Sequence, residues 1–280
     1  MEPAGPTSII QAPPVQPTLV YIAGPNGSGK SRLQTMLEQY AELPFVNADV
    51  IAKEEGLDTL AAQQQAQQRR DRMIEEGQSF VYESVFSHPN HIAAILRART
   101  RGFWVHLIFV TSPSPDVSIA RVRQRVAQGG HDVPADRIRA RWEVSRGNLP
   151  GALFRASAAT VVETADEVAA IAQWDGQQLV TCLQLPGTET SNGRELARAI
   201  EAFGEVLTQS APCTLARIDA DHYEGVVQVI VDTSACFIQA TGAGPMLHEL
   251  RHLQSPPAVR VGANIRVTYR SGIGQVELLD

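Results

Sequence analysis

Residues 24 to 31 read Gly24-Pro25-Asn26-Gly27-Ser28-Gly29-Lys30-Ser31, a full match to the pattern GxxxxGK[ST]. The β-type run Thr18–Ala23 precedes them, and Ser31–Tyr40 has helical periodicity. In this setting the glycines let consecutive backbone N–H groups surround an anion. Lys30 then reaches the β- and γ-phosphates, and the Ser31 hydroxyl takes one Mg²⁺ position. The stretch therefore predicts a P-loop that binds ATP and Mg²⁺.

Apolar β-type runs alternate with helical patterns through the first two thirds of the chain. The predicted strands are Thr18–Ala23, Phe45–Asn47, Ser79–Glu83, Phe103–Val110 and Leu179–Leu183. The predicted helices are Leu60–Glu76, Ile92–Arg101, Val117–Ala127, Ala135–Val144 and Asp166–Trp174. Such alternation is typical of parallel βαβ units. We therefore expect an α/β fold with a P-loop kinase-type parallel sheet flanked by helices.

The pattern changes after residue 185. A stretch rich in Pro, Gly, Thr, Ser and Asn, residues 186–192, reads as a linker. Beyond it we expect a helix and then short strands: Gly193–Leu207, then Gly225–Val231, Cys236–Ala240, Ala258–Val261, Asn264–Tyr269 and Val276–Leu279. Short strands with Gly between them indicate a small, mainly-β domain, a barrel or a sheet. The predicted division is a proline-rich disordered leader (1–17), a kinase domain (18–185), the linker (186–192) and a C-terminal domain (193–280).

Composition excludes several classes of protein. The net charge is −6, which argues against nucleic-acid binding, since that function usually needs a basic surface. No apolar run approaches the roughly 20 residues that cross a bilayer, and the N-terminus lacks the basic region of a signal peptide. The three widely spaced cysteines, Cys182, Cys213 and Cys236, form no CxxC pair or even disulfide framework. We expect a cytoplasmic protein with no membrane partner.

Two carboxylates follow predicted strands. Asp49 comes after Phe45–Asn47, and Glu83 ends the next strand, so both are expected at the carboxyl edge of the sheet, where ligands bind. A carboxylate there can accept the proton of a substrate hydroxyl during phosphoryl transfer. The alternative for Asp49 is a helix N-cap, and for Glu83 a strand-end charge or a Mg²⁺ contact.

Arginines flank the segment Gly129–Pro134. Arg121, Arg123 and Arg125 precede it, and Arg137, Arg139 and Arg141 follow it. A hinged lid carrying arginines would stabilise charge on a moving γ-phosphate and exclude water. The alternative is a pair of solvated helix faces. The Gly129-Gly130 hinge downstream of a P-loop favours the lid.

Together these blocks resemble the zeta toxin family of P-loop kinases, most closely its predicted-ATPase branch. The stretches that carry the resemblance are Ala23–Ser31, Asn47–Ala52, Ser79–Pro89, Arg121–Pro134, Ile138–Arg141 and Asn148-Leu149. The resemblance implies that Asp49 is the base, that Glu83 and the nearby Ser87 lie by the acceptor, and that Arg121, Arg125 and one of Arg137, Arg139 or Arg141 contact phosphates. It also implies a nucleotide-sugar acceptor and a small helical antitoxin as partner.

This chain differs from the family at positions that bind the acceptor. The family carries Thr and Arg donors at the positions of Val85 and Ser87. Losing a charged donor should cost on the order of several kcal/mol in acceptor binding. The predicted acceptor is therefore a hydroxyl of a small molecule, with a nucleotide sugar as one candidate.

The C-terminal region offers two further readings. Tyr223–Val276 resembles the KfrB domain, which implies a plasmid-associated protein partner. Residues 248–252 also spell HExxH, the pattern that places two imidazoles of a helix on one zinc ion with Glu249 as base. The leading interpretation remains a small-molecule kinase, a phosphotransferase. The alternatives are a nucleotide-gated switch that recruits a partner through the C-terminal domain, and a zinc metalloprotease.

Overall fold

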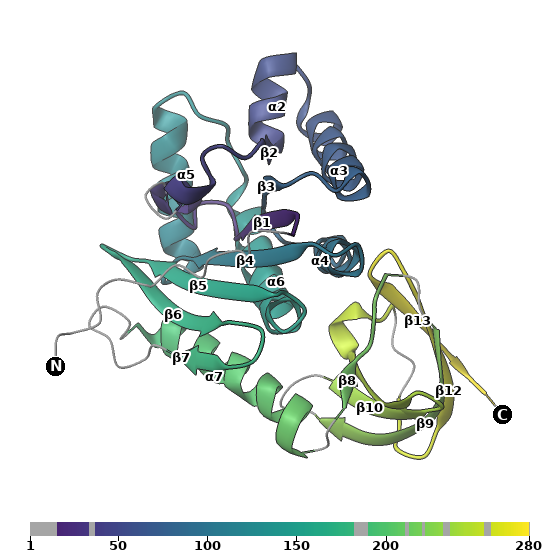
Figure 1. Cartoon of the computed structure of the whole chain (residues 1–280). Coiled ribbons are helices and arrows are strands. Elements are labelled where there is room, and N and C mark those ends of the chain that lie inside the picture. Colours follow the sequence, from purple (N-terminus) through teal and green to yellow (C-terminus); the bar gives the residue numbers. More distant parts are fainter. Residues whose placement is uncertain are drawn as a thin grey trace, which may run out of the picture.

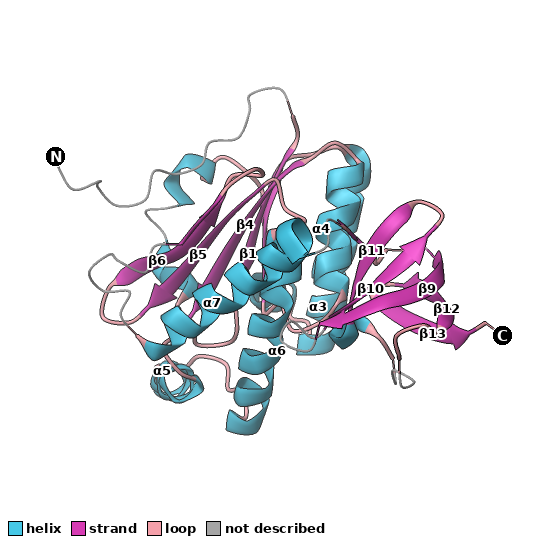
Figure 2. Ribbon diagram, turned by 90° about the horizontal axis from the view of Figure 1, so that it is seen from below, coloured by secondary structure: helices cyan, strands magenta, loops and turns pink. Residues whose placement is uncertain are grey.

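The computed structural model describes residues 16–33, 37–181, 190–210, 213–219, 222–231, 236–254 and 259–279. Within them the strands form a seven-stranded and a six-stranded sheet (Figure 1). The first sheet has flanking helices, and the second is nearly free of them (Figure 2). The predicted fold class, an α/β sheet with a mainly-β C-terminal part, is confirmed. The predicted domain boundaries stay predictions, and most of the leader and linker lies outside the described residues.

The larger sheet has the strand order β2-β3-β1-β4-β5-β6-β7. Its parallel strands are β2 (Phe45–Asn47), β3 (Phe80–Ser84), β1 (Thr18–Ala23), β4 (Trp104–Thr111) and β5 (Ala158–Thr164). Every residue of β1 and β4 is buried. This explains why both strands are apolar throughout, since a central parallel strand is covered on both faces.

Helices join these strands and cover the sheet. They are α2 (Ala48–Glu55), α3 (Thr59–Glu76), α4 (Asn90–Thr100), α5 (Pro115–Ala127), α6 (Ala135–Leu153) and α7 (Ser191–Glu205). A π-helical turn, Val206–Ser210, extends α7. No helix among the described residues is long and apolar enough to cross a membrane.

One sequence prediction for this sheet is wrong. The segment Asp166–Trp174 is not a helix: Val168–Trp174 forms β6, which pairs antiparallel with the unpredicted strand β5 and with β7 (Leu179–Thr181). Pairing with β5 overrides the helical preference of its alanines, since strand formation depends strongly on neighbours. The predicted helical segment Ser31–Tyr40 lies partly outside the described residues, since 34–36 are not described. Its described residues on either side are helical, in the 3₁₀ helices Lys30–Leu33 and Glu38–Tyr40.

The second sheet has the order β13-β12-β9-β10-β11-β8. Its strands are β8 (Thr214–Leu215), β9 (His222–Val231), β10 (Cys236–Thr241), β11 (Gly244–Glu249), β12 (Asn264–Arg270) and β13 (Ile273–Leu278). Neighbours pair antiparallel except β11 with β8. The predicted strand Ala258–Val261 is not formed at residues 259–261, and Ala258 is outside the description.

The HExxH pattern does not lie on an α-helix, so the zinc-protease alternative lacks the helix that its geometry requires. His248 and Glu249 end β11, and Leu250–His252 is a single 3₁₀ turn. Glu249 forms a buried ion pair with Arg155, whose Nη1 lies 2.9 Å from its Oε2. Within the described residues no group of three His, Cys, Asp or Glu side chains could hold a metal ion.

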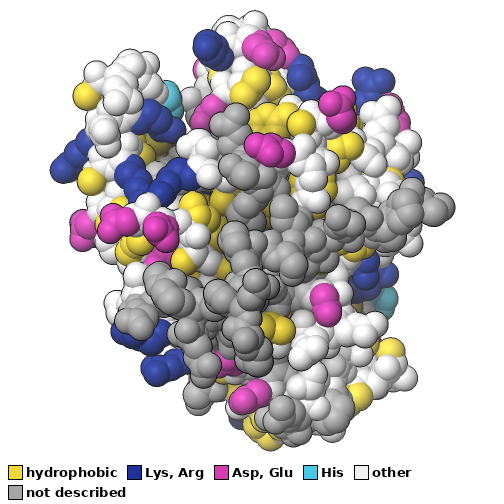
Figure 3. All heavy atoms as spheres, turned by 60° about the vertical axis from the view of Figure 1, so that its left-hand side comes forward, with side chains coloured by type: hydrophobic (Ala, Val, Ile, Leu, Met, Phe, Trp, Pro, Cys, Tyr) yellow, Lys and Arg dark blue, Asp and Glu magenta, His cyan; other side chains and the backbone are white. Residues whose placement is uncertain are grey.

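The two sheets share one hydrophobic core. A continuous cluster of buried side chains runs from Leu19 and Phe109 of the first sheet through Leu196 and Ile200 of α7 to Tyr269 of the second. The described surface carries both charge signs on the face in Figure 3, with basic side chains gathered toward its upper left.

Candidate nucleotide and acceptor site

The P-loop connects β1 to the first 3₁₀ helix and depends on its glycines. Gly27 has φ +75° and Gly29 has φ +90°, in the left-handed region that other residues avoid. A methyl group added at Gly27 would lie 2.3 Å from the Ser118 carbonyl oxygen, and one at Gly29 would lie 2.7 Å from Thr164 Oγ1. Both glycines are therefore required by conformation and by close packing.

This loop has the donors that a phosphate chain needs. Among the described residues, the amides of Gly27 and Gly29 have no hydrogen-bond acceptor, and the buried Ser28 hydroxyl has no partner. Lys30 Nζ donates to the carbonyls of Gly24 at 2.9 Å and Pro25 at 3.2 Å. Burial lowers the pKa of Lys30, while the carboxylates of Glu83 and Asp49 raise it. These groups fit a nucleotide phosphate chain.

Asp49 lies in the first turn of α2, but it does not cap that helix. The Asn47 side chain is the cap, accepting from the amides of Asp49 at 2.6 Å and Val50 at 3.2 Å. The Asp49 carboxylate has no hydrogen-bond or ion-pair partner in the described part of the chain. It is therefore available to a ligand.

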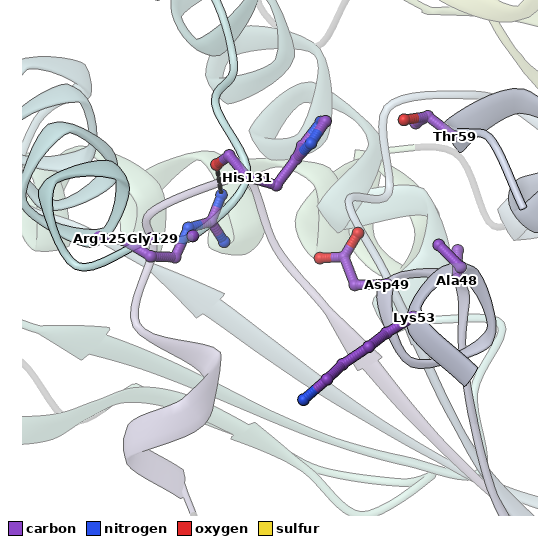
Figure 4. A pocket seen from close by; sticks show the side chains of 9 residues that line it. Ala48, Asp49, Lys53, Thr59, Arg125, Gly129 and His131 are labelled. Carbon is purple, nitrogen blue, oxygen red and sulfur yellow. Dashed lines mark hydrogen bonds between the residues drawn. The ribbon is translucent and has the colours of Figure 1, made fainter. Parts of the chain in front are cut away.

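Two cavities meet at Asp49 and Lys53. One, of about 670 Å³, is lined by Lys30, Ser31, Asn47, Asp49, Lys53, Glu83 and apolar side chains that include Phe45 and Val81. The other, of about 550 Å³, lies between α2 and the predicted lid and is lined by Ala48, Asp49, Ala52, Lys53, Thr59, Arg125, Gly129, Gly130 and His131 (Figure 4). In Figure 4 the Asp49 carboxylate points from α2 into this space, opposite Arg125 and His131.

Glu83 is the next-to-last residue of β3, and Ser87 lies in the turn that follows this strand. Glu83 Oε1 is 3.8 Å from Lys30 Nζ, which brings this carboxylate to the P-loop. Ser87 is half-buried and follows Phe86, a residue with φ +63°. The exposed hydroxyl of Ser31 and the Glu83 carboxylate line the same cavity, so these oxygens could hold Mg²⁺.

Arg121 joins the P-loop to the end of β5 by hydrogen bonds. Its Nη1 donates to Thr164 Oγ1 at 2.8 Å and to the Gly27 carbonyl at 3.4 Å, and its Nη2 donates to the Thr164 carbonyl at 2.5 Å. All these acceptors belong to the protein. In this structure Arg121 therefore orients the loop and its neighbouring strand rather than pointing into either cavity.

The other predicted arginines are divided between the cavity and the surface. Arg125 lines the smaller cavity and donates to the His131 carbonyl at 2.8 Å. Arg141 Nη1 donates to Asn26 Oδ1 at 2.9 Å, which ties α6 to the P-loop. Arg139 forms an exposed ion pair with Asp116 and lines neither cavity. The structure thus brings Arg125 and Arg141 to the site and leaves Arg139 outside it.

Sequence reasoning missed Lys53 and Thr164. Lys53 lies one helical turn after Asp49, so the i, i+4 spacing could have placed both on one face of α2. Thr164 ends β5, a strand that the sequence did not predict, and its hydroxyl donates to the Ser28 carbonyl at 2.5 Å. No local signal pointed to Thr164.

A comparison with protein families finds a match to the model described as Zeta toxin over residues 56–175, from the start of α3 to the end of β6. Residues 56–175 are similar to zeta toxins. An uncharacterized protein of Haemophilus influenzae is 27% identical over 133 residues, covering 46% of this chain and 94% of that protein.

A comparison with solved structures finds chains of low sequence identity. A chain of the AvrRxo1-ORF1:-ORF2 complex with ATP has a TM-score of 0.52 at 20% identity, covering 73% of this chain and 68% of that one. In the crystal form with sulphate ions, this chain spans 63% of the matched chain. A chain of the PezAT toxin-antitoxin system of Streptococcus pneumoniae has a TM-score of 0.44 at 13% identity, covering 74% and 91% of the two chains. At these identities the likeness concerns architecture alone.

Proposed function

We propose that this protein is a Mg-ATP-dependent kinase that transfers the γ-phosphate to a hydroxyl of a small molecule. The observation that carries the proposal is the Asp49 carboxylate, which has no partner among the described residues and lines both cavities. One of these cavities is also lined by Lys30 and Ser31 of the P-loop. The similarity of residues 56–175 to zeta toxins supports the same reaction class.

The P-loop and Asp49 would have different roles in the reaction. Backbone amides around Gly27 and Gly29 would bind the phosphate chain, with Lys30 on the β- and γ-phosphates. Asp49 would accept the proton of the acceptor hydroxyl as its oxygen forms the new bond to the γ-phosphorus. The bond from the γ-phosphorus to the bridging oxygen then breaks, and ADP leaves with the electron pair.

Cations would stabilise the charge that moves. Arg125 faces Asp49 across the smaller cavity, and Arg141 is tied to the P-loop through Asn26. The Ser31 hydroxyl and a neighbouring carboxylate would hold Mg²⁺, which would supply positive charge to offset that of the phosphates. Closure of residues 129–134 over the site would exclude water.

The acceptor is proposed to be a small molecule that binds beside β3. Glu83 and Ser87 lie on the acceptor side, and a nucleotide sugar remains one candidate. The loss of the Thr and Arg donors at Val85 and Ser87 favours an acceptor with fewer phosphate contacts than the toxin substrate.

The experiment combines nucleotide binding with transfer. ATP affinity is measured by calorimetry, and γ-labelled ATP is incubated with a panel of nucleotide sugars, nucleosides and small hydroxylated metabolites. Lys30→Ala should weaken ATP binding, whereas Asp49→Asn should keep it and lower transfer by about 10²-fold or more. The matched control is Glu54→Gln, which removes the same charge from an exposed position of α2 that lines neither cavity. Unchanged transfer in Asp49→Asn would favour the nucleotide-gated switch instead.

A protein partner is a separate part of this proposal. One of the compared structures, AvrRxo1-ORF1:-ORF2, is a complex of two different proteins. We propose that a small antitoxin-like or plasmid-associated protein binds this chain. To test this, the chain is co-expressed with the products of its neighbouring genes, one at a time, and analysed by size-exclusion chromatography. We expect one product to elute with the chain as a stable complex. If the chain elutes alone in every case, the proposal is contradicted.

A further inference from the structure

The turn that leaves β3, residues 84–89, holds an unusual backbone. We call these residues the acceptor-side loop, because they follow Glu83 and include Ser87. Phe86 has φ +63° although it is a bulky residue, and its side chain is fully buried. Its ring stacks on His91 with centroids 5.6 Å apart and meets the edge of Tyr21 at 5.7 Å. Such a conformation persists only where the surroundings hold it.

Helix α6 holds the middle of this loop. Asn148 Nδ2 donates to the Phe86 carbonyl at 3.2 Å, and the Ser145 hydroxyl shares its one proton between the Val85 carbonyl at 2.7 Å and the Arg141 carbonyl of its own helix at 2.6 Å. The start of the loop is joined to the P-loop, since the Gly24 amide donates to the Ser84 carbonyl at 3.2 Å. The loop therefore links the phosphate-binding turn to α6.

The same helix packs on the C-terminal sheet with another face. A methyl group at Gly147 would lie 2.6 Å from Arg251 Nη1, and one at Gly151 would lie 2.4 Å from Glu249 Oε2. Arg155, one further turn along, makes the buried ion pair with Glu249. Gly147 and Gly151 are four residues apart on one face of α6, and Arg155 follows the end of this helix. The C-terminal sheet thus packs against α6, and α6 in turn holds the acceptor-side loop.

The C-terminal sheet also touches the end of the loop directly. The hairpin β12–β13 turns at Ser271 and Gly272, which have φ +51° and +83°. A methyl group at Gly272 would lie 2.7 Å from the carbonyl carbon of Pro89 and 2.8 Å from its oxygen. The tip of this hairpin reaches the start of α4 in Figure 1.

We infer that the C-terminal sheet is a positioning element of the acceptor site, acting on the acceptor-side loop through Gly272 against Pro89 and through α6. This inference deepens the proposed function and rests on it in placing the acceptor beside Glu83 and Ser87. Gly272 contacts no reacting group, so it is a positioning residue. The substrate-reading part of the site is then built by two regions of the chain that are distant in sequence.

The test compares two glycine variants of the full chain. Gly272→Ala places an alanine in the left-handed backbone region, and its methyl group also overlaps Pro89. Gly262→Ala introduces the same backbone strain, since Gly262 has φ +85°, but its methyl group would meet no atom within 4 Å. Hydrogen exchange of the peptide covering residues 80–91 is measured by mass spectrometry in both variants and the wild type.

We expect exchange in residues 84–89 to rise about five-fold or more in Gly272→Ala and to match the wild type in Gly262→Ala. For the acceptor found in the panel above, Gly272→Ala should raise KM about ten-fold or lower kcat to a similar extent, with ATP affinity unchanged. Equal exchange in the two variants would overturn the inference.

The outcomes separate this inference from the proposed kinase. Hydrogen exchange is measured without any acceptor, so loosening of the loop in Gly272→Ala alone supports the positioning contact even if no acceptor is phosphorylated. Transfer that depends on Asp49 together with an undisturbed loop in Gly272→Ala would keep the kinase and refute the positioning role.

Discussion

Glu249→Gln should be among the most destabilising single changes in the C-terminal part of the chain. The Glu249 carboxylate is fully buried, and its Oε2 lies 2.9 Å from Arg155 Nη1 and 3.3 Å from His252 Nδ1. Burial alone would raise the pKa of Glu249, but the neighbouring His252 and Arg155 side chains lower it well below its usual range. The group is therefore charged in the folded protein.

The magnitude follows from what the substitution leaves behind. Gln keeps the shape of Glu but removes the negative charge, so the Arg155 guanidinium remains in an interior where its side chain is 3% exposed. Breaking a buried ion pair by removing one partner costs about 3–5 kcal/mol. Against a total stability of about 5–15 kcal/mol, this loss is large.

The assay is urea unfolding followed by circular dichroism. The matched control is Glu224→Gln, which removes a carboxylate from the exposed ion pair with Arg266 at 2.5 Å and should cost less than about 1 kcal/mol. The double variant Arg155→Met/Glu249→Leu should recover part of the loss, since both charges leave the interior together. If Glu249→Gln and Glu224→Gln cost the same, the claim that this pair is buried and paired in solution is refuted.

Two more predictions concern pH and the P-loop. Burial lowers the pKa of His91 to about 3, of His106 to about 4 and of His248 to about 3. In the unfolded chain the pKa of each histidine is near 6.5, so below that pH the unfolded chain binds protons that the folded chain excludes. As the pH is lowered from 6.5 to about 4, the free energy of unfolding should therefore fall by about 1.4 kcal/mol per pH unit for each histidine. Urea midpoints between pH 7.5 and 4.5 measure this, and a flat profile would contradict it. Separately, Gly29→Ala should weaken ATP binding about ten-fold or more, because alanine at φ +90° costs about 1–2 kcal/mol and its methyl group overlaps Thr164. Calorimetry checks this against Gly56→Ala, whose φ of +68° is similar but whose methyl group would meet no atom within 4 Å; equal ATP affinities in the two variants would speak against the packing argument.

Local pattern was enough to predict much of the first sheet. Strands β1 and β4 follow from apolar runs that are buried along their whole length, and α3 follows from its composition and helical spacing. The carboxyl-edge rule also brought Asp49 and Glu83 to one cavity with Lys30. The catalytic roles given to these residues stay predictions.

Local pattern failed where pairing or distant contacts decide. Val168–Trp174 is a strand because β5 lies beside it, and the HExxH residues lie on a strand end and a 3₁₀ turn because β10 pairs with β11. Arg121 could be placed near phosphates by motif, but its bonds to Thr164 depend on a strand that the sequence did not reveal.

The amino-acid sequence by itself determined that the chain has a glycine-rich P-loop motif between a buried strand and a helical segment, in an α/β fold. These features rest on side-chain types and on φ values that neighbouring residues dictate. Only the tertiary structure decided that the Asn47 side chain caps α2 while the Asp49 carboxylate is left unpaired among the described residues, and that the C-terminal sheet packs against the acceptor-side loop. Those outcomes depend on contacts between residues far apart in the chain, such as Gly272 with Pro89 and Glu249 with Arg155, and such contacts leave no periodic signal in either segment.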